Sequence, residues 1–188
     1  KHLYEVMDEK GIIKLLAPPF NKEYGAGYIG EYIPGVRENG GQYTHAAVWL
    51  ASAFAQLGQG DKCFEMLDMI NPIKKSDNLY KSQKYKVEPY VLPADVYLSG
   101  RGGWTWYTAS SSLYFCAILE DLLGIRMENG EITVKPHIPE NWKEYTVEID
   151  TDDIKCSVKV LNPGMHSNSV SRTVKSEKDG VEEIRVIM

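Results

Sequence analysis

The spacing of hydrophobic residues changes once along this chain, near residue 125. Before that point apolar positions recur with the 3.6-residue period of helices. After it they alternate with polar positions or form β-branched runs, as strands do. We therefore expect an α+β protein, with a helical part over residues 1–124 and a β part over residues 125–188.

Three stretches of the first part predict helices of several turns. Residues 44–57 read THAAVWLASAFAQL and are apolar almost all the way round, and residues 108–123 form a second mostly apolar helix. Between them, Asp61 is a suitable N-cap for a helix that ends before Pro72. The polar, lysine-rich segment that follows is expected to add one short helical turn after Asp77.

The second part predicts an antiparallel β region of the sandwich type. Each strand candidate alternates or is β-branched, which fits strands that bury one face. The strand candidates are residues 132–134, 146–149, 154–160 and 183–187, and the turn candidates are Asn129-Gly130, Asp152-Asp153, Asn162-Pro163-Gly164 and Asp179-Gly180.

The helical part has more apolar surface than its own helices cover. A helix that is apolar on most sides needs neighbours all round, and leaving apolar surface in water costs roughly 25 cal/mol per Å². The chain also starts at Lys1, inside residues 1–9 whose spacing is helical, with no initiator Met. We therefore expect either a homo-oligomer or a piece of a larger helical domain.

Composition and charge narrow the function classes. The chain has 188 residues, of which 43% are hydrophobic, and a formal net charge of -5 without a long basic run, so a globular protein is expected and a nucleic-acid surface has little support. No apolar run approaches the ~20 residues of a membrane span, and the start is not a signal peptide, so we expect a cytoplasmic protein. Cys63, Cys116 and Cys156 lie far apart without a CxxC pair, which predicts buried free thiols rather than a zinc or redox site.

Two polar, glycine-rich segments carry the candidate chemistry. Residues 36–45 read VRENGGQYTH and run directly into one apolar helix, and residues 100–108 read GRGGWTWYT and lead into the other. Loops held by rigid neighbours are where binding and catalytic groups are concentrated. We expect the two segments to form two halves of one anion and sugar site.

Five motifs stand in a fixed order along the first 150 residues. They are PGVRENGGQYTH at residues 34–45, MINPI at 69–73, YKVEPY at 85–90, GRGGWTWYT at 100–108 and IPENW at 138–142. In kind and order, this set resembles the C-terminal part of the inverting glycoside phosphorylases of the cellobiose phosphorylase type. It is similar in particular to the phosphorylase-like region of cyclic β-1,2-glucan synthases.

The resemblance implies a fragment of a larger enzyme, with the last helices of an (α/α)6 barrel over residues 1–124 and a β-sandwich segment over residues 125–188. In such enzymes inorganic phosphate attacks the anomeric carbon with inversion, while one carboxylic acid protonates the leaving oxygen. The substrate would be a β-linked oligosaccharide or glucoside, phosphate a co-substrate, and no other cofactor or metal would be needed.

The general acid of the family is an aspartate in a tryptophan-containing motif upstream of the region represented here, and no such motif occurs in this chain. Glu38, Glu88 and Asp95 are the carboxylates near the motifs, and none is assigned as the acid. We therefore expect no catalytic residue in this fragment, and no activity without the missing N-terminal part of the same protein.

The family's phosphate contacts fall on His45, on Thr108 and on the backbone amide of Ala109. Thr108 also reads as the N-cap of its helix, whose unpaired N–H groups and positive dipole end favour an anion. The family often has Gly where this chain has Ala109, which keeps the N–H group but narrows the space. The substrate-binding positions are Arg37, Glu38, Gln42, Tyr43, Glu88, Arg101 and Trp104.

Structural roles compete with several of these assignments. His45 at a helix start is also compatible with a satisfied structural histidine, Glu88 with an acceptor that holds its loop, and Arg101 with an ion pair. Stacking on a sugar ring competes with burial in a core for the aromatic residues Tyr43, Trp104, Trp106 and Tyr107. His2, His137 and His166 read as structural or exposed, and no spacing of histidines and carboxylates indicates a metal site.

Two other functions stay open at this point. One is a non-catalytic carbohydrate-binding or structural module. The other is an inverting hydrolase on the same barrel, which needs a second carboxylate as base, with Glu88 as the candidate.

Overall fold

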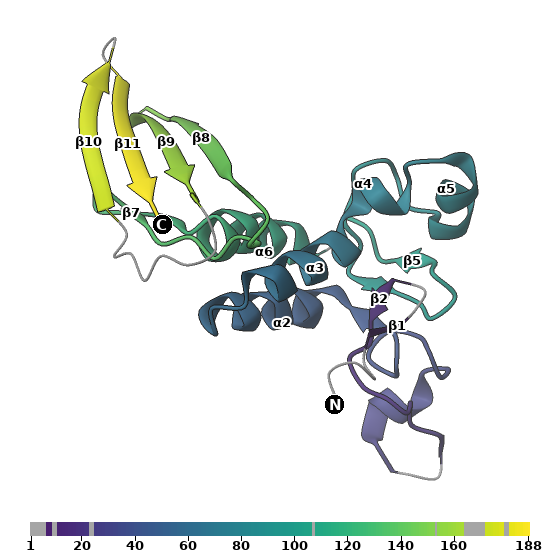
Figure 1. Cartoon of the computed structure of the whole chain (residues 1–188). Helices are drawn as coiled ribbons and strands as arrows, with labels where there is room; N and C mark the ends of the chain where they lie inside the picture. The colour runs from purple at the N-terminus through teal and green to yellow at the C-terminus, as the bar shows by residue number, and fades with distance from the viewer. Residues whose placement is uncertain are drawn as a thin grey trace.

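The computed structural model describes residues 7–8, 11–22, 25–106, 108–152, 154–163, 172–178 and 181–188, with the backbone alone for residues 7–8, 172–178 and 181. Three helices lie at the centre of the molecule (Figure 1). A four-stranded sheet lies on one side of them, and a region of loops and short helices lies on the other.

The first two central helices form a hairpin. Helix α2 (Thr44–Gln56) confirms the helix predicted over residues 44–57, and α3 (Gly60–Ile70) confirms the one that follows. Asp61 lies in the first turn of α3 rather than at its N-cap, which is Gln59. The start of α3 packs against the backbone of residues 137–138, where a Cβ on Gly60 would clash with two carbonyl oxygens.

The third central helix has two parts. Helix α6 (Ser110–Cys116) continues directly into a π-helical segment, η3 (Ala117–Leu122), so the helix predicted over residues 108–123 is confirmed but starts two residues later. The residue at the N-cap is Ala109, not Thr108. The Thr108 hydroxyl instead accepts a hydrogen bond from the backbone N–H of Ser110 at 3.1 Å, a local turn placed just before the helix.

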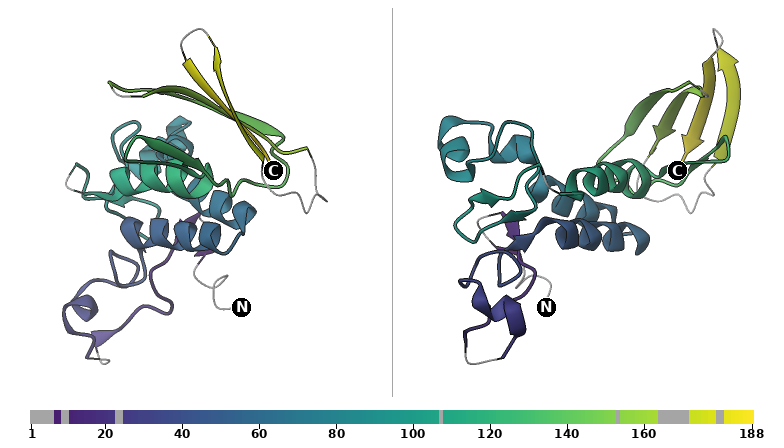
Figure 2. Two further views of the ribbon diagram at one scale, coloured as in Figure 1. Left: turned by 90° about the vertical axis from the view of Figure 1, so that its left-hand side faces the viewer. Right: turned by 180° about the vertical axis from the view of Figure 1, so that it is seen from behind.

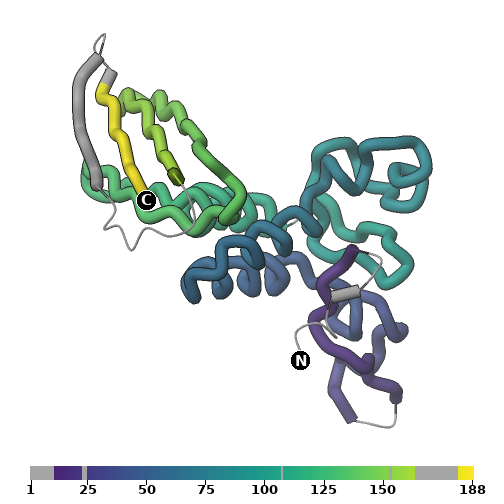
Figure 3. Tube along the Cα trace, in the orientation of Figure 1, coloured from purple at the N-terminus to yellow at the C-terminus, as the bar shows by residue number. Residues whose placement is uncertain are grey.

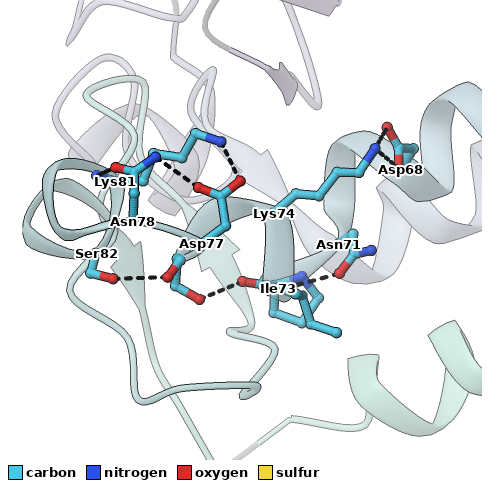
Figure 4. Close-up of polar contacts among 10 residues, drawn as sticks. Asp68, Asn71, Ile73, Lys74, Asp77, Asn78, Lys81 and Ser82 are labelled. Carbon is cyan, nitrogen blue, oxygen red and sulfur yellow. Dashed lines mark hydrogen bonds and ion pairs between the residues drawn. The ribbon is translucent and has the colours of Figure 1, made fainter.

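Two short helices follow α3, and the second confirms the short helix predicted after Asp77. They are α4 (Pro72–Lys75) and α5 (Leu79–Tyr85). The side chains of Asn71 and Asn78 cap them by accepting backbone N–H groups (Figure 4). The sequence signal was the pair of asparagines, since Asn is among the preferred N-cap residues.

A small sheet joins parts of the chain that are distant in sequence. Its strands are β3 (Gln42–Tyr43), β4 (Asp95–Val96) and β5 (Gly102–Gly103), paired antiparallel in the order β3-β4-β5. Asp95 of the middle strand pairs with Tyr43 on one side and with Gly103 on the other. The trace in Figure 3 shows the chain returning to this region after the α2–α3 hairpin.

The N-terminal prediction fails where it can be checked. Met7–Asp8 forms strand β1, which pairs antiparallel with β2 (Ile12–Ile13), so residues 7–8 are not helical. Ile12 and Ile13 are both buried, and the extended pairing places them against the core. The remainder of the predicted helix lies outside the described residues. Further along, a 3₁₀ helix, η2 (Gly27–Glu31), lies in the loop between β2 and β3.

The second part of the chain forms a hairpin and a four-stranded sheet. The hairpin pairs β6 (Ile125–Glu128) with β7 (Glu131–Val134), and the sheet contains β8 (Glu144–Asp150), β9 (Lys155–Leu161), β10 (Arg172–Lys178) and β11 (Val181–Ile187) in the order β10-β11-β9-β8. All four predicted strands are confirmed, and β6 and β10 were missed. The predicted turns at Asn162-Pro163-Gly164, Asp152-Asp153 and Asp179-Gly180 fall partly or wholly outside the described residues.

The expectation of a wholly antiparallel region is wrong, because β9 and β11 run parallel. After β8 and β9, the polar strand β10 takes the far edge of the sheet and pairs antiparallel with the more apolar β11. Ile184 and Val186 of β11 are thereby buried beside Val158 and Val160 of β9. A polar edge strand also resists pairing with other molecules.

Two large hydrophobic clusters, with a small third one of Ile12, Tyr85 and Val96, hold the molecule together. The first combines the α2–α3 hairpin with α6 and includes Val48, Met66 and Ile70, and the second lies between the four-stranded sheet, the β6–β7 hairpin and Leu119 of η3. Cys63 and Cys156 are buried free thiols as expected, but Cys116 is exposed. It lies on the outer side of α6, which no described element covers.

The central helices keep uncovered apolar faces, as their sequences predict. Trp49 is 60% exposed, Phe115 64% and Leu57 71%. The two views in Figure 2 show α2 open to solvent on the side away from the four-stranded sheet. Among the described helices, none has both the length and the apolar character that crossing a bilayer requires.

The first cluster predicts a large effect of core truncation. Met66 is fully buried, so Met66→Ala should lower the free energy of unfolding by about 2–5 kcal/mol through lost burial and the cavity left behind. Met127 is 42% exposed, and Met127→Ala should change it by less than about 1 kcal/mol. Urea unfolding followed by circular dichroism measures both. Equal effects of the two substitutions would contradict this assignment of the core.

Candidate functional site

The loop over residues 35–41 is a compact turn. The Gly35 N–H donates to the Asn39 carbonyl at 2.7 Å, and the Gly41 N–H donates to the Arg37 carbonyl at 3.1 Å. The loop is tied to the segment after α5 through the Leu98 N–H, which donates to the Gly35 carbonyl at 2.7 Å. Each of the two polar segments is also bonded to residues 94–97, because the Thr44 N–H donates to the Ala94 carbonyl and the Ala94 N–H donates to the Trp104 carbonyl.

Asn39 fixes this loop from inside. It is completely buried, and its Oδ1 accepts the Phe20 N–H at 2.7 Å. Its Nδ2 donates to the carbonyls of Phe20 and Tyr32, both at 2.9 Å. The sequence analysis did not assign Asn39 a role. The signal available was an amide beside two glycines, which is typical of a turn but does not reveal partners seven and nineteen residues away.

Gln42, predicted to bind substrate, is buried and already engaged. Its Oε1 accepts the Ile13 N–H at 3.1 Å, and its Nε2 lies 3.4 Å from the Thr44 hydroxyl oxygen. In this arrangement the side chain ties β2 to β3. Its neighbour Tyr43 is half-buried and pairs with Asp95 across the small sheet.

Arg37 and Trp104, from the two segments, are brought together. The Arg37 guanidinium lies 5.4 Å from the ring centre of Trp104 and 5.4 Å from that of Tyr32. Two aromatic faces around one cation hold it by cation–π attraction. Arg37 Nε also lies 3.4 Å from Glu38 Oε2, an ion pair without hydrogen-bond geometry.

Asp95 is an acidic group buried beneath this pair. Its side chain is fully buried, and within the described part of the chain neither carboxylate oxygen has a hydrogen-bond partner. Burial raises the pKa of the Asp95 carboxyl, with Arg37 opposing the change and Glu38 adding to it. The sequence signal was a single aspartate among apolar residues in LPADV, which indicates a buried charge but not its neighbours.

Three of the predicted substrate residues line one cavity of about 480 Å³. Glu88, Arg101 and Trp104 share it with Lys86 and Tyr97, which the sequence analysis did not single out. Arg101 is exposed and forms no ion pair with any described residue, so the alternative of a purely structural ion pair has no support there. The cavity combines two cations and a carboxylate with aromatic walls, a lining suited to hydroxyl-rich or anionic ligands.

Glu88 holds the second segment in place. Its Oε1 accepts the Trp106 indole N–H at 3.1 Å and the Thr105 hydroxyl at 3.3 Å. Its own backbone N–H and the Trp106 indole lower the pKa of the Glu88 carboxyl below its usual value of 4.5. The carboxylate is therefore ionised at neutral pH and serves the loop-holding role considered for it. Since it also lines the cavity, the same group is accessible to a ligand.

Residues with left-handed backbone are concentrated around this cavity. Arg37, Lys86, Tyr90, Trp104 and Trp106 all have φ between 49° and 69°. Such values are uncommon for residues other than glycine and cost free energy, so they persist where the surrounding structure enforces them. Concentration of this strain at one place marks the cavity as a candidate functional site.

The three predicted phosphate residues lie at the starts of two central helices. His45, in the first turn of α2, is half-buried and makes an edge-to-face contact with Trp49, with ring centres 5.0 Å apart. Thr108 is half-buried and shares a hydrogen bond with the Ser110 hydroxyl at 2.7 Å, and Ala109 is exposed. Tyr107 lies outside the described residues.

The small sheet relates these two helix starts. α2 begins directly after β3, and α6 begins seven residues after β5, with β4 between the two strands. His45 therefore follows the strand residue Tyr43, and Thr108 follows the strand residue Gly103, on the two sides of Asp95. Among the residues that the structure describes, no three His, Cys, Asp or Glu side chains gather where they could hold a metal ion.

Comparison with known proteins gives a consistent set of relatives. Residues 2–124 match the model of the glycosyl hydrolase 94 superfamily, catalytic domain. The chain is 40% identical over 178 residues to the cyclic beta-(1,2)-glucan synthase NdvB of Rhizobium meliloti. The aligned region covers 92% of this chain and 6% of that protein.

Two phosphorylases are also similar. The N,N'-diacetylchitobiose phosphorylase of Vibrio furnissii is 29% identical over 177 residues, covering 93% of this chain and 22% of that enzyme. The 1,2-beta-oligoglucan phosphorylase of Listeria innocua is 25% identical over 166 residues, covering 78% of this chain and 15% of that enzyme. The chain thus spans less than a quarter of the length of each of these relatives.

The burial of Asn39 predicts that the loop depends on it. Asn39→Ala should lower the free energy of unfolding by about 2–4 kcal/mol, because three buried backbone groups lose their partners. Asn141 is exposed, and Asn141→Ala should have an effect within about 0.5 kcal/mol. Denaturant unfolding compares them. Equal stability of the two variants would show that Asn39 is not the residue that fixes the loop.

The raised pKa of Asp95 predicts a pH-dependent loss of folding stability. A carboxyl whose pKa is higher in the folded state binds its proton more tightly there, so stability falls as pH rises from 3.8 through the raised value. Asp95→Asn should therefore stabilise the chain at neutral pH by about 1 kcal/mol or more, and the gain should vanish below the unfolded pKa.

The pH dependence of unfolding, compared between wild type and variant, measures this effect. Asp152→Asn, an exposed carboxylate whose substitution makes the same chemical change, is the control. A variant that is less stable than wild type only at neutral pH would show instead that the attraction between Asp95 and Arg37 outweighs burial.

Proposed function

This chain belongs to the glycosyl hydrolase 94 superfamily, and we propose that it supplies the phosphate-binding half of a glycoside phosphorylase that cleaves β-glucosides with inorganic phosphate and inversion. The observation that carries the proposal is the contact of Arg37, from residues 36–45, with Trp104, which lines a mixed-charge cavity formed by residues 86–88, 97 and 101–105. The phosphorylases among its relatives support the same activity.

Phosphate would lie between the first turns of α2 and α6. There His45 and the Thr108 hydroxyl offer hydrogen-bond donors, and the backbone amide of Ala109 precedes a run of helical N–H groups whose dipole favours an anion. In this role Thr108 gives up its contact with Ser110 to the ligand. Phosphate itself is the nucleophile, so this half of the site needs no carboxylate to activate water.

The sugar would occupy the cavity next to the Arg37–Trp104 pair. Trp104 is 59% exposed and offers a flat face to the C–H groups of a pyranose ring. Glu88 accepts hydrogen bonds from sugar hydroxyls, and Arg101 donates them. The general acid that protonates the leaving oxygen would come from a part of the enzyme that this chain does not contain, so the chain alone would bind ligands without turnover.

The same proposal accounts for the bare helices. In a complete enzyme α2, α3 and α6 would be the last helices of an (α/α)6 barrel, and Trp49 and Phe115 would pack against its other helices. The four-stranded sheet and the β6–β7 hairpin would form the sandwich segment that follows the barrel.

Phosphate binding at the two helix starts is tested by nuclear magnetic resonance. Adding inorganic phosphate to the chain should shift the imidazole signals of His45 and the amide signal of Ala109 in a saturable way. Thr108→Val should weaken this binding about tenfold, the value of one hydrogen bond to a charged ligand. Thr133→Val on the exposed face of β7 makes the same chemical change and should leave it unchanged.

Two results would replace the proposal with another function. Saturable binding of a β-linked oligosaccharide with no phosphate response at His45 or Ala109 would identify a carbohydrate-binding module. Hydrolysis of a β-glucoside by the complete enzyme without phosphate, abolished by Glu88→Gln, would identify an inverting hydrolase.

A further inference from the structure

A second cavity, of about 490 Å³, lies between the end of α3, the helices α4 and α5, and the Gly100 turn. Four lysines line it: Lys74, Lys75, Lys81 and Lys84. Asp68 is the one acidic residue of its lining. None of the residues predicted for the phosphate and sugar site belongs to it.

Two of the four lysines are neutralised. Lys74 Nζ lies 2.5 Å from an oxygen of Asp68, and Lys81 Nζ lies 2.6 Å from Asp77 Oδ2 (Figure 4). Each of these pairs cancels its own charge, the first with a carboxylate of the cavity lining and the second with a carboxylate outside it. They leave the positive charge of the cavity to the other two lysines.

Lys75 and Lys84 have no carboxylate partner in the described part of the chain. Lys75 donates a hydrogen bond to the carbonyl of Gly11, a neutral acceptor, and the stem of Lys84 lies against Gly100. Burial, together with the charges of Lys84 and Lys81, lowers the pKa of Lys75 to about 8. The cavity therefore holds two uncompensated ammonium groups, and a bound anion would relieve the unfavourable free energy of their charges.

From this charge arrangement we infer that the cavity is a second phosphate site, which takes a phosphate group carried either by inorganic phosphate or by a sugar phosphate. A phosphate carries between one and two negative charges at neutral pH, which matches the two unpaired lysines. Lysine binds phosphate as a point charge, whereas carboxylate ligands favour the flat fork of arginine, and no arginine lines this cavity.

The cavity walls fit a ligand larger than phosphate as well. Tyr80 is 75% exposed at the cavity and offers an aromatic face to a sugar ring. Tyr85, on the next turn of α5, is buried and closes the inner wall. A sugar phosphate would place its charged group between Lys75 and Lys84 and its ring on Tyr80.

Lysine footprinting of the whole chain tests the site. Near pH 8, where Lys75 is partly uncharged and reactive, acetylation by an amine-specific reagent is followed at each lysine by mass spectrometry. Inorganic phosphate should slow acetylation of Lys75 and Lys84 about tenfold relative to chloride of equal ionic strength. Lys135 and Lys143, which are exposed in the β part, should react at unchanged rates.

Two variants make the test specific. Lys84→Met breaks no ion pair, and it should remove the protection of Lys75 by phosphate. In the matched control Lys143→Met, phosphate should still protect Lys75. In Thr108→Val, phosphate should also still protect Lys75, so that failure of the proposed phosphate contact at α6 and failure of this site are distinguished.

The choice between the two carriers comes from the same experiment. Stronger protection by glucose 1-phosphate than by inorganic phosphate would identify a sugar phosphate site, and equal protection would identify a site for phosphate itself. Protection by chloride or by glucose alone to the same extent, or full protection of Lys75 in Lys84→Met, would overturn the inference.

Discussion

The register of one six-residue sheet holds the candidate site together. Asp95 of β4 pairs with Tyr43 on one side and with Gly103 on the other, so the loop before α2 and the turn before α6 meet at a fixed separation. The third strand has to be glycine, because a Cβ on Gly102 would clash with Val87, and one on Gly103 would press against the Asp95 carboxylate and Tyr97. The glycines of the second segment therefore serve close approach of backbone to side chain.

This arrangement carries a cost in free energy that the neighbouring structure offsets. Asp95 is buried without a hydrogen-bond partner in the described part of the chain, and five residues around the cavity have left-handed backbone. Asn39 holds the loop that carries Arg37 by three buried hydrogen bonds, and Glu88 holds the second segment by two side-chain contacts. Strain that persists at such a place fits a site arranged for a ligand rather than for stability.

The sequence predicted those features that repeat over many residues. The helices over residues 44–57 and 108–123 and the strand over residues 154–160 follow from periodicity, which tertiary context rarely overrides at this length. The two-residue strands of the small sheet have no period to detect. The parallel pairing of β9 with β11 depends on which strand of a hairpin is more apolar. The lysine cavity depends on the folding of three segments that are distant in the sequence.

The prediction of the site residues rests on a different kind of signal. Five motifs in order indicated which residues to compare, and the structure brings Glu88, Arg101 and Trp104 to one cavity. The motifs could not indicate that Gln42 is buried or that Asn39 fixes the loop, because a motif records residue types and not their partners.

One aromatic contact links the uncovered face of α2 to His45, which is predicted to bind phosphate. His45 leans edge-to-face on Trp49, one turn further along α2, and Trp49 is 60% exposed. A segment that packs on Trp49 restricts its rotamer, and the His45 ring that rests on it is restricted as well. Covering the outer face of α2 therefore orients the imidazole toward a fixed direction. In this fold, packing against Trp49 would both bury the outer face of α2 and set the orientation of the His45 imidazole.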